Sequence, residues 1–511
     1  MINNPIIWAD YPDLDVIRVE DTYYMVSTTM HFMPGCVILR SYDLVHWEMA
    51  THVYDALEET PAQKLEGDKQ IYGKGMWAAS IRYHKEKFYV CFVANDTHKT
   101  YLYSASDING TWEKQIIEGF YHDCSLLFDD DERVYIVYGN REIHLTELKR
   151  DLSGPKPDGL NRVIVTDTEP HYLGYEGSHL YKINGKYYVF FIHMLKSKGR
   201  RTEACFVADS LEGEFTGGEV FNDDMGYHNS GIAQGGIVDT PDGKWYSMLF
   251  QDHGAVGRIP VLIPLHWEND FPVFDVKAPE YIEVPSTRPE YKYKPLVGND
   301  DFIYEPDENG KVSLKDFWQW NHIPNPSLWS VTEKPGTYRI HSGKISPNLI
   351  YAANTLTQRT MGPACEAIVT LDGRELKDGD YAGLCFLIST YGFIGLTKED
   401  GQSYLVMCAR AGEDKSIFGS LVDNEPAAEY ARIPVNGHKV TLKAYGNFVD
   451  NTDECEFYYE DGSEWHKLGI THRMAFKMDM FVGCRFSLFM YSTKEIGGTA
   501  EFSKFIYNVI E

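Results

Sequence analysis

Short apolar segments, each interrupted by a polar turn, recur along the first 290 residues of the chain. In each copy an apolar segment leads to a polar turn, and an aromatic or β-branched pair then opens a second apolar segment. Such alternation between turn-forming residues is typical of β-hairpins, whereas long helical periodicity is scarce. The pattern predicts an all-β chain. The five copies are DVIRVEDTYYMVST (15–28), SIRYHKEKFYVCFV (80–93), SLLFDDDERVYIVY (125–138), HLYKINGKYYVFFI (179–192) and GIVDTPDGKWYSML (236–249).

The spacing of these copies predicts how the hairpins are arranged. The residue pair that opens the second segment begins at Tyr23, Phe88, Val134, Tyr187 and Trp245, which gives intervals of 65, 46, 53 and 58 residues. Intervals of this size, with a hairpin in each copy, indicate a β-propeller, whose blades are four-stranded sheets around a common axis. Five copies therefore predict a five-bladed β-propeller over residues 1–290. The alternative is a sandwich of ordinary hairpins, in which turns recur every ~8–12 residues without a longer period.

A Pro- and Lys-rich segment, residues 277–296, separates this region from a second series of alternating segments. The segment lacks clear periodicity, so we expect a linker that lies on a protein surface. Residues 297–511 predict antiparallel strands that form a two-sheet, jelly-roll-like β-sandwich. This second domain has no obvious catalytic group. It is either a sugar-binding module or a packing partner that completes the rim of an active site, and we favour the second.

The charge of the chain excludes several classes of partner. Its 511 residues carry 75 acidic and 48 basic side chains, and the formal net charge of -27 repels nucleic acid backbones and anionic lipids. We therefore expect no nucleic acid and no membrane partner. The nine cysteines form no CxxC pair, and the N-terminus shows no export signal, so we expect reduced, mostly buried thiols in a cytoplasmic protein.

One position of the repeat carries the candidate chemistry. Counting back ten residues from Tyr23, and eleven from the other four pairs, gives Asp13, Trp77, Asp123, Glu176 and Gln234. The innermost strands of a propeller surround its axis, so equivalent positions near one end of those strands converge on a central pocket. Three of the five positions are acidic. The sequence therefore predicts three carboxylic acids on one axial face.

Three acids in one pocket indicate acid–base chemistry. Carboxylates repel one another and lose solvation there, a cost that a purely structural site avoids. Hydrolysis of a glycosidic bond needs two carboxyl groups on opposite sides of a sugar ring, one to protonate the leaving oxygen and one to assist attack. A carbohydrate-binding propeller without catalysis is the alternative, and the three acids argue against it. A propeller that serves as a scaffold for proteins would show an apolar axial face and no such acids.

Several segments together resemble glycoside hydrolase family 43. They are NPIIWADYPDLDVIRVEDTYYM (4–25), GMWAASIRYHKEKFY (75–89), HDCSLLFDDDERVYIVYG (122–139), EGSHLYKINGKYY (176–188) and WNHIPNP (320–326). The resemblance extends over nearly the whole chain and is closest to the xylan-degrading branch of that family. It implies a five-bladed propeller enzyme with a C-terminal β-sandwich.

The resemblance also implies a role for each acid. Asp13 corresponds to the general base, Glu176 to the general acid, and Asp123 to the residue that raises the pKa of the acid and holds it in place. The repeat arithmetic selects the same three residues independently. Two departures affect the local loops, because the proline that usually follows the base and the middle Asp is replaced by Leu14 and Cys124.

Further candidates concern the substrate and a metal ion. Sugar rings stack on aromatic side chains, so Trp77, and then Phe32 and His31 in the loop TTMHFMPG, are predicted to form the sugar platform. Arg258 matches a family arginine that faces the sugar. In many members a His at the position of Gln234 holds a structural calcium ion on the propeller axis, and His253 is the residue here that could replace it. The chemistry itself requires no cofactor.

The leading hypothesis is an inverting, exo-acting hydrolase of arabinose- or xylose-containing oligosaccharides. It would be an α-L-arabinofuranosidase, a β-xylosidase or both. A blind central pocket would admit only a chain end or a side branch. The sequence leaves open which sugar is cleaved.

Overall fold

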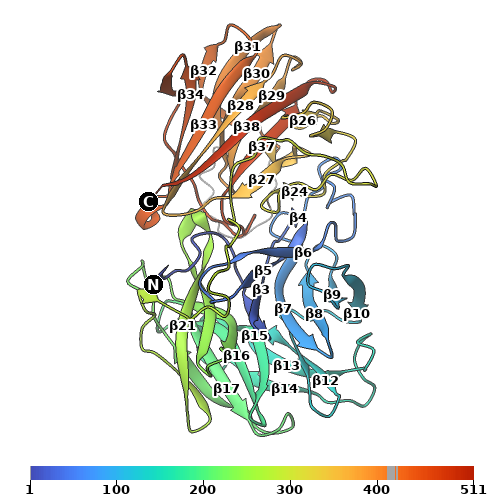
Figure 1. Ribbon diagram of the computed structural model, residues 1–511, viewed down its shortest axis with the longest axis vertical. Coiled ribbons are helices and arrows are strands. Elements are labelled where there is room, and N and C mark those ends of the chain that lie inside the picture. Colours follow the sequence, from blue (N-terminus) through green and yellow to red (C-terminus); the bar gives the residue numbers. More distant parts are fainter. Residues whose placement is uncertain (1, 411–420, 422–423, 511) are drawn as a thin grey trace.

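The computed structural model describes residues 2–410, 421 and 424–510. It consists of two all-β units, a propeller and a sheet-rich sandwich, that lie end to end (Figure 1). Within the described residues the only helices are three short 3-10 turns, which are η1 (Gly254–Val256), η2 (Leu349–Tyr351) and η3 (Val449–Asn451). The predicted fold class is therefore confirmed.

Five four-stranded antiparallel sheets form the propeller, and each runs outward from the axis in chain order. Each predicted hairpin forms the two innermost strands of one blade. The first blade contains β2 (Asp15–Val19), β3 (Thr22–Ser27), β5 (Gly35–Ser41) and β6 (Glu48–Tyr54), and the second contains β7 (Met76–His84), β8 (Lys87–Ala94), β9 (Lys99–Ala105) and β10 (Glu113–Ile117). The other three blades are β11 (Ser125–Phe128), β12 (Val134–Asn140), β13 (Glu142–Leu148) and β14 (Asn161–Thr166); β15 (His171–Ile183), β16 (Lys186–Leu195), β17 (Thr202–Ala208) and β18 (Thr216–Phe221); and β19 (Ala233–Asp239), β20 (Trp245–Asp252), β21 (Arg258–Glu268) and β22 (Phe271–Phe274).

The faces of neighbouring blades pack on each other and form the propeller core. One buried cluster joins the fourth and fifth blades, with Phe190 on one side and Leu249 and Val261 on the other, all fully buried. The aromatic pairs of the sequence repeat supply much of this surface, because Tyr23, Tyr187 and Tyr188 are buried or nearly so. Alternating apolar positions thus hold the blades together and fix the directions of the innermost strands.

The N-terminal segment joins the first blade to the last. The side chain of Asn4 donates to the carbonyl of Leu262 (2.7 Å) and accepts from its N–H (3.1 Å), so the segment follows strand β21. Strand β1 (Ile2–Asn3) then pairs with β23 (Tyr281–Ile282), beyond the fifth blade. The linker that follows lies on the propeller surface, where Arg288 forms an ion pair with Asp21 (2.7 Å).

The C-terminal unit is a sandwich of two antiparallel sheets with an apolar interior. Its first sheet has the order β32 (Ala428–Pro434), β31 (Gln402–Ala409), β30 (Gly392–Glu399), β29 (Asp380–Leu387), β37 (Arg485–Ser492), β27 (Leu356–Arg359), β24 (Gln319–Asn321) and β4 (Phe32–Met33). Its second sheet has the order β25 (Trp329–Ser330), β26 (Tyr338–His341), β38 (Thr499–Ile510), β28 (Ala364–Asp372), β33 (Lys439–Asn447), β34 (Glu454–Asp461) and β35 (Glu464–Lys467), and β36 (His472–Arg473) also pairs with β34.

The edge strand β4 ties the two units together. It comes from the loop after the first propeller hairpin, yet Phe32 pairs with Asn321 and Met33 with Trp320 in the sandwich sheet.

All nine cysteines are buried and none is in a disulfide. No helix in the described part of the chain is long and apolar enough to cross a membrane.

Candidate active site

The five positions selected by the repeat line one pocket. Its volume is about 80 Å³, and its lining includes Asp13, Trp77, Asp123, Glu176 and Gln234. Trp77, Glu176 and Gln234 lie on the innermost strands of their blades, whereas Asp13 and Asp123 lie two residues before theirs. The predicted convergence on one axial end is therefore present in the structure.

The backbone at these positions is unusual. Asp13, Asp123 and Gln234 all have positive φ, at 55°, 49° and 63°. Asp tolerates this conformation better than most residues, and such backbone strain concentrates at functional sites. Glu176 lies where the pairing of β15 with β16 shifts register on both sides, a bulge that redirects its side chain. The next residue must be Gly177, with φ of 66°, because a Cβ there would lie 2.6 Å from the side chain of Gln234.

Asp13 is held by a buried arginine. Nη1 of Arg258 lies 3.0 Å from Oδ1 of Asp13, and the arginine side chain is 3% exposed. The neighbouring Asp10 has a different function, because its carboxylate accepts the backbone N–H groups of Arg258 (2.9 Å) and of Gly483 from the sandwich (2.7 Å). Asp10 is thus a structural clamp, and Asp13 is the acid of this segment that lines the pocket.

A histidine bridges Asp123 and Glu176. Nε2 of His122 lies 3.6 Å from Oδ2 of Asp123 and 3.5 Å from Oε2 of Glu176. The amide of Asn140 also donates to Glu176, while Oδ1 of Asp123 is buried without a partner. His122, Asp123 and Glu176 each place one atom that could bind a metal ion within 4.8 Å of the other two.

The electrostatics of this pair leave a proton in the pocket near neutrality. Burial, opposed by His122 and aided by Glu176 and Asp13, raises the pKa of Asp123 to about 7. The carboxylate of Asp123, aided by Glu176 and against burial, raises the pKa of His122 to about 9. At pH 7 the site therefore combines a histidine cation with an Asp123 carboxyl group that still holds a proton part of the time. Such a pair is suited to donating a proton.

The sandwich supplies one wall of the pocket. Phe481 and Met478 lie in its lining, although both are about 300 residues or more from the first and second blades in the sequence. The guanidinium of Arg258 lies 4.2 Å from the ring centre of Phe481, and the indole of Trp77 lies 5.7 Å from it. The second domain therefore completes the site, as the favoured prediction for it stated.

A buried cluster of polar side chains lies on the innermost strands, between this pocket and the far ends of those strands. The carboxylate of Asp15 is fully buried, and its Oδ2 lies 2.5 Å from Nη1 of Arg82. The other oxygen contacts His179 (3.1 Å) and the hydroxyl of Tyr181 (3.3 Å). Arg82 also donates to Ser125 (2.7 Å) on the third blade. These residues, which we call the axial plug, close the pocket from below.

The prediction that His31 and Phe32 form a sugar platform is wrong. Both side chains are fully buried, and the ring of Phe32 lies under the guanidinium of Arg485 (3.4 Å). His31 packs on Phe32 and on His322 of the sandwich. The loop was assigned to the substrate because it is aromatic and follows a hairpin, but the pairing of β4 with β24 directs it into the interface.

Gln234 and His253 do not form a calcium cage. Calcium prefers ~6–8 oxygen ligands, and Gln234 offers one amide oxygen to the pocket. Nε2 of His253 is hydrogen-bonded to Oε1 of Gln251 (2.7 Å), and the His253 ring stacks on Tyr227 with a ring-centre distance of 3.8 Å. His253 is not among the residues that line the pocket. Burial lowers the pKa of His253 to about 4. These two residues do not fit the ion, and calcium on the axis stays a prediction.

Sequence reasoning did not identify His122, Asn140 or Phe481. His122 directly precedes Asp123, so its adjacency to a predicted acid was an available signal. Asn140 ends strand β12 at a turn, one strand outward from Asp123. Nothing in the local sequence of Phe481 indicates a site, because its role depends on how the two domains pack.

This fold and this pocket define a glycoside hydrolase. Residues 2–272 match the model of glycosyl hydrolases family 43, and residues 307–508 match a beta xylosidase C-terminal concanavalin A-like domain. The chain belongs to glycosyl hydrolase family 43.

Named relatives and solved structures agree with this assignment. The chain is 26% identical to a beta-xylosidase of Formosa agariphila over 99% of its own length and 90% of the relative. It is 27% identical to a non-reducing end alpha-L-arabinofuranosidase of Bacteroides ovatus, over 67% of its own length and 65% of the relative. A bifunctional GH43-CE structure of Bacteroides eggerthii superposes with a TM-score of 0.90 at 41% identity; the match covers all of this chain but only 64% of that one.

Proposed function

We propose that this chain is an inverting, exo-acting hydrolase that releases terminal arabinofuranose, xylose or both from arabinoxylan- or xylan-derived oligosaccharides. The observation that carries the proposal is the convergence of Asp13, Asp123 and Glu176 on one small pocket. The names of the relatives, which include both a beta-xylosidase and an alpha-L-arabinofuranosidase, support the two sugar classes.

In the proposed mechanism Asp13 acts as the general base. Its carboxylate takes a proton from a water molecule, and the oxygen of that water attacks the anomeric carbon. Arg258, 3.0 Å from the carboxylate, orients it. The hydrogen bond between these side chains fixes the base relative to strand β21.

Glu176 acts as the general acid on the opposite side of the sugar. It donates its proton to the glycosidic oxygen as the bond to the anomeric carbon breaks. Asn140 and His122 contact its Oε2 and orient the carboxyl group. Asp123, whose pKa is about 7, supplies a neighbouring carboxyl group that holds a proton near neutral pH. After each turnover the base has gained a proton and the acid has lost one, and exchange with solvent restores both.

The walls of the pocket support an exo mode of action. The axial plug closes the pocket from below, and Phe481 of the sandwich closes one side. A chain that must thread through cannot enter, whereas a terminal pentose can. The indole N–H of Trp77 is buried without a partner, which makes it a suitable donor to a sugar hydroxyl.

Activity on aryl glycosides tests the proposal. Wild-type protein is expected to hydrolyse 4-nitrophenyl α-L-arabinofuranoside, 4-nitrophenyl β-D-xyloside or both, and the corresponding hexopyranosides much more slowly. Absence of turnover with both pentosides would contradict the proposal. The cytoplasmic location stays a prediction.

A further inference from the structure

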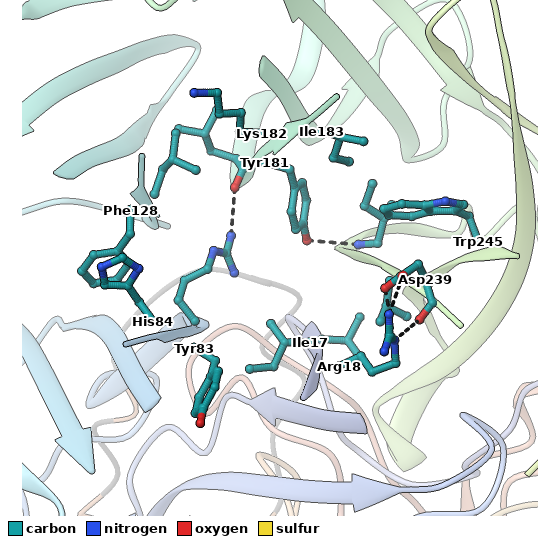
Figure 2. A pocket seen from close by; sticks show the side chains of 16 residues that line it. Ile17, Arg18, Tyr83, His84, Phe128, Tyr181, Lys182, Ile183, Asp239 and Trp245 are labelled. Atoms are coloured by element: carbon teal, nitrogen blue, oxygen red, sulfur yellow. Dashed lines mark hydrogen bonds and ion pairs between the residues drawn. The ribbon is translucent and has the colours of Figure 1, made fainter. Parts of the chain in front are cut away.

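A second hollow lies at the opposite end of the propeller axis. Its volume is about 320 Å³, within the ~300–1,000 Å³ range of small-molecule sites. Side chains from all five blades surround it (Figure 2), because each innermost strand contributes its last residues. We call it the distal hollow.

The distal hollow is separate from the active site. Arg82 of the axial plug also lines the hollow, and its Nη2 donates to the carbonyl of Leu180 (3.2 Å). None of the residues that line the catalytic pocket lines this hollow. A molecule bound here would therefore not occupy the position of the cleaved sugar.

The charged groups of the distal hollow are already paired within the protein. Arg18 binds Asp239 through Nη2 (2.6 Å) and Nε (3.2 Å), and Lys182 binds Asp129 and Asp130. A phosphate or carboxylate ligand would need an uncompensated cation. The hollow is instead suited to a neutral ligand.

Aromatic rings form a large part of its wall. Tyr83 is 42% exposed at the rim, and Trp245 lies on the other side (Figure 2). On the side away from Trp245, Phe128 stacks with His84 at a ring-centre distance of 4.6 Å and an interplanar angle of 8° (Figure 2). Exposed aromatic rings beside polar groups suit a sugar, whose C–H faces are apolar while its hydroxyls need hydrogen bonds.

The backbone supplies these polar groups, because every innermost strand is the edge of its sheet. Ile81 N–H donates to a carboxylate of the axial plug, and Ile237 N–H donates to the hydroxyl of Tyr181 (3.0 Å), so both point toward the axis. Backbone direction repeats every second residue along a strand. The N–H groups of Tyr83 and Asp239, two residues further on, therefore also face the axis, at the level of the hollow.

We propose that the distal hollow is a second carbohydrate-binding site that takes neutral saccharides. The choice of pentose-based saccharides as its ligands rests on the proposed function. Binding there would hold a substrate chain on the enzyme without hydrolysing it. Trp245 and Tyr83 provide the stacking surfaces.

Isothermal titration with xylohexaose tests the proposal, with Asp13→Asn protein as the host so that the ligand stays intact. We expect xylohexaose to bind to this host at the distal hollow. Addition of Trp245→Ala should raise the dissociation constant of that site at least tenfold. Since Trp245 also packs against Trp267, Tyr83→Ala serves as a second variant, and it should weaken the same site. Tyr430→Ala, an exposed tyrosine of the sandwich, is the matched control and should leave the titration unchanged.

Trp245→Ala in the otherwise wild-type chain should keep the wild-type kcat on aryl pentosides. The proposal is overturned if the host binds xylohexaose identically with and without both aromatic substitutions. If aryl pentosides are hydrolysed but xylohexaose binding does not depend on the two aromatic residues, the proposal of a second site is wrong and the proposed function stands. If no pentoside is hydrolysed but binding dependent on Trp245 is observed, the proposed function fails and the second site stands.

Discussion

Replacement of His122 by glutamine should move the alkaline limb of the pH–rate profile to higher pH. The alkaline limb reports loss of the proton that the general acid needs. In the wild type the carboxyl group beside the general acid, that of Asp123, has a pKa of about 7 and so holds a proton near neutral pH. The His122 cation favours the ionised form of Asp123, so removal of the cation raises the pKa of Asp123.

The structure sets the size of this effect. With a pKa of about 9, the His122 ring is ~99% protonated at pH 7. Its Nε2 lies 3.5 Å from Glu176, and two unit charges at that distance interact by about 4.7 kcal/mol at an effective dielectric constant of about 20. Charge delocalisation and the partial exposure of the histidine reduce this value. We therefore expect the limb to rise by at least about one pH unit, equivalent to ~1.4 kcal/mol.

The assay is kcat/KM for an aryl pentoside between pH 4 and 10. Glutamine keeps a hydrogen-bond donor near the carboxylates but carries no charge. His98→Gln is the matched control, since His98 is exposed and stacks on Phe120 (4.1 Å) on the same blade as Trp77; its profile should match the wild type. An alkaline limb that stays in place, or moves to lower pH, in His122→Gln would refute the electrostatic role of this histidine.

Three other substitutions have defined outcomes. Asp13→Asn should lower kcat more than a thousandfold, about 4 kcal/mol, with the circular dichroism spectrum of the folded wild type; a rate within tenfold of the wild type would move the base elsewhere. Phe481→Ala should lower kcat/KM at least tenfold, ~1.4 kcal/mol, because the wall of the pocket is lost, and unchanged steady-state kinetics would show that this wall is dispensable. Arg82→Met should lower the free energy of unfolding in urea at pH 7 by ~3–5 kcal/mol, since the buried Asp15 carboxylate loses its arginine partner. Burial alone would raise the pKa of Asp15, but Arg82 and His179 hold it below its usual value. The stability that the Asp15–Arg82 ion pair contributes is therefore present above about pH 4 and is lost as the pH falls further. The difference in the free energy of unfolding between Arg82→Met and wild type should therefore become smaller at acidic pH. A difference that does not change with pH would contradict the ion-pair account.

The catalytic pocket was predictable from the sequence because the propeller is a repeat. Equivalent positions in a repeat occupy equivalent places around the axis, so a constant offset from the aromatic pair selects Asp13, Trp77, Asp123, Glu176 and Gln234 without knowledge of any contact. The same logic predicts the five blades. It depends only on period and alternation, which are local properties of the chain.

The remaining parts of the site depend on contacts between distant segments. Phe481 reaches the pocket because the sandwich packs on the propeller, and no periodic pattern encodes that arrangement. Phe32 was misassigned for the same reason, since its loop pairs with a strand almost 300 residues away. His253 follows the fifth hairpin closely, yet its ring is engaged by Tyr227 and Gln251. A lone aromatic or histidine in a loop therefore needs a tertiary structure before its role can be assigned.

The most direct test of the central claim is the anomeric configuration of the first sugar released. Proton NMR during hydrolysis of an aryl β-D-xyloside or α-L-arabinofuranoside identifies the anomer before mutarotation mixes the two forms. The account predicts the inverted product, α-xylose from the β-xyloside or β-arabinofuranose from the α-arabinofuranoside, and no release by Asp13→Asn protein. Release of the retained anomer, or undiminished release by the variant, would contradict the assignment of Asp13 as the base that activates water.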